Sequence, residues 1–132
     1  MATRADVGST KFVYLGVSWG AADGVIYSTL LQDRLKTVVL LDGGYLLNPP
    51  SPGRDQADFA PRLKIPVLMV NGRYDFSFSP DNAQNPPFRM LGTPEAEKEH
   101  VLLETPHEVR AKRPQLIAAV LPWLDKYLGA VL

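Results

Sequence analysis

Residues 11–20 read Lys-Phe-Val-Tyr-Leu-Gly-Val-Ser-Trp-Gly, the segment most informative about the fold class. Its continuous apolar run predicts a strand, Lys11–Val17, that is covered on both faces, as strands of parallel sheets are. Beyond it, apolar residues recur at helical spacing and predict a helix, Gly20–Leu31. A buried strand that leads directly into a helix is typical of alternating β and α elements, so the stretch predicts an α/β fold.

Three further apolar runs extend this alternation along the chain. They predict strands at Thr37–Leu41, Ile65–Val70 and His100–Leu103, with Pro66 tolerated because it lies at a strand start. The stretch Gly43–Arg62 is rich in Pro, Gly, Ser and Asp and predicts a long loop without a buried element. Together these runs predict a single domain, residues 1–132, with about four parallel strands and flanking helices.

Two proline-containing segments complete the expected secondary structure. Pro80–Leu91 is a poor helix candidate, because Pro86 and Pro87 interrupt it. Pro114–Leu128 predicts a closing helix with a bend at Pro122, since an interior proline removes a backbone hydrogen bond. The expected apolar face of this helix comprises Leu116, Ile117, Val120, Leu121, Leu124 and Leu128.

The overall composition excludes several classes of function. The 132 residues include 14 basic and 14 acidic side chains, so the net charge is zero. The chain therefore has no broad positive electrostatic potential that would favour binding to a nucleic acid or an anionic membrane. The chain contains no cysteine, which excludes disulfides and thiol nucleophiles. No apolar run is long enough to cross a bilayer and the first ten residues lack a secretory pattern, so we expect a cytoplasmic protein.

The pentapeptide Gly16-Val17-Ser18-Trp19-Gly20 has the Gly-x-Ser-x-Gly pattern, at a strand-to-helix junction. Small residues on both sides let the backbone make a tight turn that presents the serine hydroxyl outward. The following helix N-terminus favours a developing oxyanion. The pattern therefore predicts Ser18 as a nucleophile, although a glycine-rich turn without chemistry remains the alternative.

A serine nucleophile needs a base and a group that orients the base. Of the two histidines, His107 follows the fourth predicted strand and shares the carboxyl edge with Ser18, whereas His100 begins that strand and is expected to be a surface residue. For the acid, Asp75 follows the third predicted strand, and Asp42, after the second, is its rival. The order Ser18, Asp75, His107 is the order of α/β-hydrolases.

The segment Ile-Pro-Val-Leu-Met-Val-Asn-Gly-Arg-Tyr-Asp, residues 65–75, resembles the strand and acid loop of α/β-hydrolases. The histidine loop and the closing helix resemble the end of that fold, closest to dienelactone hydrolases and acetyl xylan esterases. The resemblance covers nearly the whole chain and implies a triad of Ser18, Asp75 and His107. It also implies that the Trp19 backbone N–H is one oxyanion donor. The Thr-Pro before His107 departs from the family, which usually has glycine there.

The resemblance implies that the family's first four strands are lacking, and with them a second oxyanion donor. Lys11–Val17 would then be an unpaired apolar edge strand, so we expect self-association, most simply as a homodimer. Removing one oxyanion donor typically costs about 2.7–4 kcal/mol, a loss that a weak enzyme tolerates.

The leading hypothesis is a carboxylic ester hydrolase that acts on small esters and needs no cofactor. Trp19, Tyr74 and Phe76 are candidate substrate-binding residues, and no spacing predicts a metal site. The competing hypothesis is a non-catalytic half-domain that completes its sheet by self-association or with a partner.

Overall fold

The computed structural model describes residues 12–46 and 55–130. Its strands form one parallel sheet in the order β1-β2-β3-β4. They are β1 (Phe12–Val17), β2 (Leu35–Leu41), β3 (Val67–Gly72) and β4 (Lys98–Leu103). The α-helices are α1 (Trp19–Leu31), α2 (Gln56–Phe59), α3 (Asn85–Met90) and α4 (Arg113–Leu128). Short helical turns lie at Gln32–Arg34, Ala60–Arg62, Pro80–Gln84, Glu95–Glu97 and Val109–Lys112.

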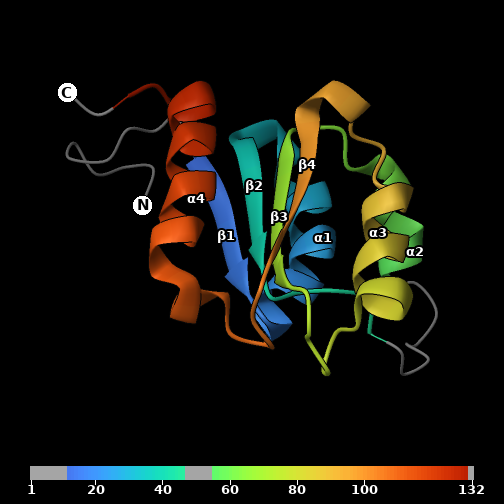
Figure 1. Ribbon diagram of the computed structural model, residues 1–132. Helices are drawn as coiled ribbons and strands as arrows, with labels where there is room; N and C mark the ends of the chain where they lie inside the picture. Colours follow the sequence, from blue (N-terminus) through green and yellow to red (C-terminus); the bar gives the residue numbers. More distant parts are fainter. Residues whose placement is uncertain (1–11, 47–54, 131–132) are drawn as a thin grey trace.

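The helices cover both faces of the sheet. Figure 1 shows α4 on one side and α1, α2 and α3 on the other. On the α1 side, the core includes Ala21, Val25, Val38, Leu40, Leu63, Val67 and Met69. On the α4 side, it includes Val39, Leu41, Leu68, Val70, Leu103, Val109 and Trp123. Residues 38–41 of β2 and 67–70 of β3 are continuously apolar, as is usual for strands that are buried on both faces of a sheet.

The predicted α/β class and the four parallel strands are confirmed. The third strand begins at Val67 rather than Ile65, because Pro66 has no N–H to donate to a neighbouring strand. The Pro66 carbonyl still accepts the Val38 N–H. The strand extends to Gly72, beyond the predicted end. Double coverage of β1 is only partial, since Leu15 is 50% exposed.

Two segments differ from prediction. In the expected loop Gly43–Arg62, residues 47–54 lie outside the described residues, but α2 forms with Asp55 as its N-cap and with Gln56 buried against α1. In Pro80–Leu91, a helical turn continues into α3. The helix forms because its prolines occupy first-turn positions, where the backbone N–H groups have no intrahelical partner.

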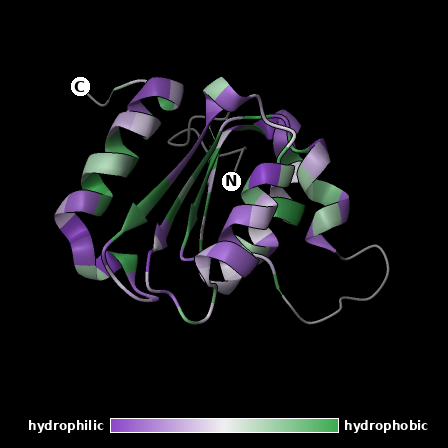
Figure 2. Cartoon of the chain, turned by 45° about the vertical axis from the view of Figure 1, so that its right-hand side comes forward, coloured by the Kyte–Doolittle hydropathy of each residue, from purple (hydrophilic) through white to green (hydrophobic). Residues whose placement is uncertain are grey.

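The closing helix was placed correctly, but the predicted apolar face was partly wrong. Ile117 and Leu121 are exposed, while Trp123 is buried and Tyr127 packs against the same core. Trp123 Nε1 donates a hydrogen bond of 2.6 Å to Thr37 Oγ1, which fixes the rotation of α4 on the sheet. The helix continues through Pro122. Figure 2 shows hydrophobic and hydrophilic residues alternating along α4.

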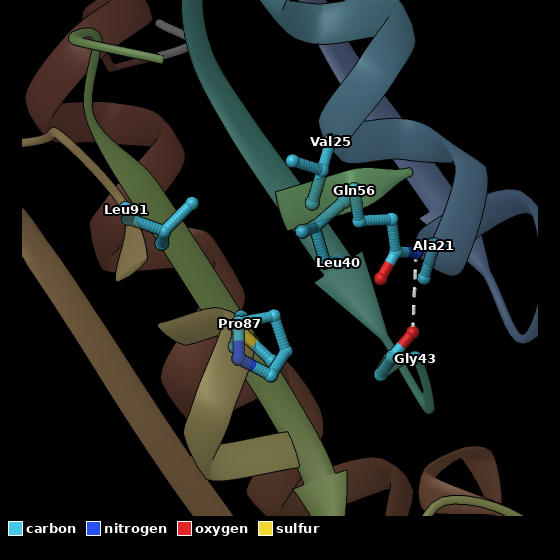
Figure 3. Close-up of a pocket in the computed structure, with 9 residues that line it drawn as sticks. Ala21, Val25, Leu40, Gly43, Gln56, Pro87 and Leu91 are labelled. Atoms are coloured by element: carbon cyan, nitrogen blue, oxygen red, sulfur yellow. Dashed lines mark hydrogen bonds between the residues drawn. The ribbon is translucent and has the colours of Figure 1, made fainter. Parts of the chain in front are cut away.

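A small internal cavity of about 10 Å³ lies between α1, β2 and α3 (Figure 3). Gln56 reaches its wall and donates to the carbonyls of Ala22 and Gly44, the latter at 3.3 Å. The cavity has room for about one water molecule, which makes it a packing feature and not a substrate site.

None of the helices in the described ranges has the length and apolar character that a transmembrane span requires.

Candidate active site

The candidate side chains gather where the parallel strands end. Ser18 directly follows β1, Asp75 lies in the loop after β3, and His107 lies in the loop after β4. Because the carboxyl ends of parallel strands share one edge, residues far apart in the chain meet there.

The structure brings Ser18, His107 and Asp75 together in one hydrogen-bonded chain. Ser18 Oγ lies 2.9 Å from His107 Nε2, and His107 Nδ1 lies 2.7 Å from Asp75 Oδ2. With Nδ1 protonated toward the carboxylate, Nε2 is free to accept the serine proton. This is the arrangement of nucleophile, base and orienting acid that acyl transfer requires.

Ser18 occupies a strained turn between β1 and α1. Its φ of 54° is rare for a residue with a side chain. The Ser18 N–H donates to the Leu41 carbonyl at 2.8 Å, and the Ser18 carbonyl accepts from Ala21 and Ala22. These bonds hold the turn, whose strain is on the order of 1–3 kcal/mol.

The Asp75 carboxylate is fully buried and its two oxygens have separate tasks. Oδ1 accepts the N–H groups of Ser77 and Phe78 at 2.8 and 2.9 Å, and Oδ2 faces His107. The buried Gln84 side chain donates to the carbonyls of Gly72 and Phe78, at 3.0 and 2.6 Å. The acid loop is therefore held at both ends, and nothing in the sequence had marked Gln84 for this role.

The rival acid, Asp42, lies beside the site but does not bond to the histidine. Its carboxylate accepts the Val109 N–H, with Oδ1 at 3.2 Å and Oδ2 at 2.9 Å. Burial raises the pKa of the Asp42 carboxyl, while the Val109 N–H and His107 act in the opposite direction. Its position after a buried strand was the one sequence signal that it would reach this edge.

Donor atoms of Asp42, Asp75 and His107 lie within 4.8 Å of one another, which is close enough to consider a metal ion. His107 Nδ1 and Asp75 Oδ2 already share a hydrogen bond, and both Asp42 oxygens accept from Val109. These partners make the cluster a hydrogen-bonded acid and base arrangement rather than a metal centre.

A cleft of about 390 Å³ opens at Ser18 and His107. Its other lining residues are Trp19, Tyr45, Leu46, Ser77 and Phe78. Of the predicted substrate-binding residues, Trp19 lines the cleft. Tyr74 instead donates its hydroxyl proton to Glu104, and Phe76 is 86% exposed, so neither side chain is among the described residues around the cleft.

His100 is not the surface residue that was expected. Its Nε2–H donates to Asn71 Oδ1 at 3.1 Å, while Asn71 Nδ2 donates to the Gly43 carbonyl at 2.7 Å. The imidazole also packs on Phe88, with ring centroids 5.3 Å apart. Burial lowers the pKa of His100 to about 4. The sequence missed this because the covering residues come from α3, whose formation was not predicted.

The four-stranded parallel sheet and its flanking helices have the α/β-hydrolase fold, as comparison with solved structures shows. An esterase from Pyrococcus furiosus superposes with a TM-score of 0.74 and 13% identity, over 90% of this chain and 54% of that one. A Paleococcus ferrophilus monoacylglycerol lipase gives 0.71 and 15%, over 89% of this chain and 69% of that one.

A Klebsiella pneumoniae protein assigned as a dienelactone hydrolase gives a TM-score of 0.68 and 22% identity, over 87% of this chain and 52% of that one. The chain thus spans about half to two thirds of the length of these three structures. No protein-family model and no curated protein sequence matches it.

Proposed function

We propose that the protein is a serine hydrolase that cleaves small carboxylic esters through an acyl-enzyme. The observation that carries the proposal is the hydrogen-bonded chain from Ser18 through His107 to Asp75, open to a cleft. The esterase and the lipase among the structures of the same fold support it.

In this mechanism the Ser18 hydroxyl attacks the ester carbonyl while His107 Nε2 takes its proton. The resulting imidazolium is stabilised by Asp75, and it then protonates the leaving alcohol. Water then gives a proton to His107 and attacks the acyl carbon. The bond between the acyl carbon and Ser18 Oγ breaks, His107 returns the proton to Oγ, and the carboxylic acid is released. Every proton is handled by His107, so the cycle needs no cofactor.

The backbone N–H of Trp19 is the proposed oxyanion donor. Trp19 is the first residue of α1, and first-turn N–H groups have no acceptor within the helix. The helix N-terminus adds a partial positive charge beside the attacked carbonyl. The aromatic and aliphatic side chains of Trp19, Leu46 and Phe78 around the cleft favour an uncharged acyl group.

The direct test is hydrolysis of p-nitrophenyl acetate, butyrate and octanoate by the parent protein and by Ser18→Ala. We expect measurable turnover in the parent and a loss of about a thousandfold or more in the variant. Asp81→Asn, an exposed position, is the matched control and should keep the parent rate. Equal rates in the parent and Ser18→Ala would refute the proposal.

Covalent labelling gives a second readout. A fluorophosphonate should modify Ser18, and the modification should be lost in His107→Ala because the hydroxyl then has no base. Mass spectrometry of the labelled peptide locates the modified residue. Labelling elsewhere, or equal labelling of His107→Ala, would contradict the assigned roles.

We also propose that the protein forms a homodimer. Within the described sheet, β1 pairs only with β2, and its Leu15 is half exposed. An apolar edge strand of this kind supports pairing with a second copy. The alternative function is a non-catalytic domain that completes its sheet with a partner. It rests on the same edge strand and predicts that Ser18 neither hydrolyses esters nor reacts with a fluorophosphonate.

A further inference from the structure

Asp42 occupies a buried position in the middle of the candidate site. It directly follows β2, which lies between the strand that leads to Ser18 and the strand that leads to Asp75. Its residue exposure is 2%, and its φ is 51°. Among the described non-glycine residues, only Ser18 and Asp42 have positive φ. Strained backbone of this kind concentrates at functional sites, where the surroundings hold it in place.

The carboxylate of Asp42 holds the distal side of the histidine loop. Both oxygens accept the N–H of Val109, a fully buried residue two positions after His107. The proximal side of the loop is fixed independently, because the Thr105 carbonyl accepts the Tyr74 N–H at 3.1 Å. The backbone is therefore held by hydrogen bonds on both sides of His107, at Thr105 and at Val109. Asp42 makes the bond at Val109.

Asp42 is anchored in turn to the sheet. Its own N–H donates to the Val70 carbonyl at 3.0 Å, in continuation of the β2–β3 ladder. The path from the sheet to the base thus runs from β3 through Asp42 and Val109 to His107. No hydrogen bond joins the carboxylate of Asp42 to the imidazole, so any effect on the base passes through the loop backbone or the electrostatic field.

We propose that Asp42 is a positioning residue that sets the distance between His107 and Ser18 by holding the Val109 N–H. The proposal rests on the ester hydrolase function proposed above. The hydrogen-bond acceptor carries the effect, and the negative charge is secondary. A side chain that keeps an acceptor at this position should preserve turnover, and one that lacks it should not.

Two variants of Asp42 distinguish the effect of its hydrogen-bond acceptor from the effect of its negative charge. Asp42→Asn keeps a carbonyl oxygen for Val109 and tolerates positive φ, so we expect its kcat to stay within about fivefold of the parent. Asp42→Gly accepts the backbone angle without strain but has no acceptor, so its kcat should fall about a hundredfold with KM nearly unchanged, as misplacement of a base predicts. Asp33→Asn, at an exposed position beyond α1, is the control.

The outcomes are distinct. A kcat for Asp42→Gly within about threefold of the parent overturns the proposal, and so does an equal loss in Asp42→Asn and Asp42→Gly, which would make the charge decisive. If Asp42→Gly does not fold, the proposal is tested by NMR on the parent protein. The measurement is the scalar coupling across the hydrogen bond, between the Val109 nitrogen and the Asp42 carboxyl carbon. Its absence overturns the proposal.

A spectroscopic readout distinguishes this inference from the activity itself. The His107 Nδ1 proton, shared with Asp75, should give a far-downfield proton NMR signal in the parent and in Asp42→Asn, and should broaden or vanish in Asp42→Gly. That pattern in a protein without esterase activity would support the positioning role while the proposed function failed. An unchanged signal in folded Asp42→Gly would overturn the positioning role even in an active enzyme.

Discussion

The Nδ1 atom of His107 lies 2.7 Å from Oδ2 of Asp75, a carboxylate whose other oxygen accepts two backbone N–H groups. Because those bonds occupy Oδ1, the carboxylate cannot rotate freely and Oδ2 stays directed at the imidazole. This fixes which histidine nitrogen carries the proton and which one faces Ser18.

Asp75→Asn is expected to reduce kcat for p-nitrophenyl acetate about a thousandfold or more, with little change in KM. An amide at this position can present an N–H toward the imidazole, which favours the tautomer that cannot accept the serine proton. Steady-state kinetics at neutral pH measure the effect, with Asp81→Asn as the isosteric control at an exposed position. A kcat close to that of the parent would exclude Asp75 as the orienting acid.

The two glycines of the pentapeptide should respond differently to alanine. A Cβ at Gly16 would lie 2.3 Å from the Gly20 carbonyl oxygen, whereas a Cβ at Gly20 meets nothing within 4 Å. We expect Gly16→Ala to destabilise the protein by about 2–3 kcal/mol, since backbone must move. Gly20→Ala, in the first turn of α1, should be neutral or stabilising by up to about 1 kcal/mol. Urea unfolding of both variants decides the matter, and equal stability changes would show that the turn is not closely packed.

Partly buried His100 should make the fold sensitive to acid. Its pKa in the fold is about 4, below the ordinary value of 6.5, so the unfolded chain binds the proton more readily. Stability from this residue is present above the unfolded pKa, is lost as the pH falls from about 6.5 toward 4, and is absent below that range. His100→Gln can still donate to Asn71 but does not titrate.

The measurement is the free energy of unfolding in urea at about pH 7.5 and about pH 4.5, a window that spans most of this titration. The parent should lose more stability between the two values than His100→Gln does. The other titrating groups are shared by both proteins and cancel in the difference. Identical pH dependence would mean that the imidazole is not held neutral in the fold.

Leu15→Lys should convert the proposed dimer into a monomer. Leu15 is half exposed on the edge strand β1, and a charged residue on such an edge opposes pairing with a second chain. Light scattering should give twice the chain mass for the parent and the single chain mass for the variant. Circular dichroism checks that both are folded. A monomeric parent would rule out the dimer.

Much of the fold could be predicted because its signals are local. Apolar runs identified all four strands, and a proline at a helix start with a glycine beyond its end located α4. The missed helices, α2 and α3, are short, and α3 has two prolines in its first turn. They form because Phe59 of α2 and Phe88 of α3 pack against the core on that side of the sheet. Their stability comes from contacts that a local pattern does not contain.

The rotation of α4 was misjudged for a related reason. Its sequence offers apolar residues on more than one side, and the choice between Leu121 and Trp123 as the buried side chain depends on the partner across the interface. That partner is Thr37, 86 positions away in the chain, whose hydroxyl receives the indole N–H. Helical spacing alone carries no information about such a partner.

Local sequence was enough to predict that a serine lies at a tight strand-to-helix turn and that an aspartate and a histidine follow later strands, because a turn and the two elements beside it are encoded by neighbouring residues. The packed fold added what the sequence could not predict, namely that Asp42 binds the Val109 N–H and leaves the imidazole to Asp75, the acid that the sequence favoured. Both carboxylates follow strands that end at the same edge of the sheet, Asp42 directly and Asp75 three residues into its loop. Which one reaches a given nitrogen depends on ångström-scale loop paths that are fixed only when the whole sheet is packed.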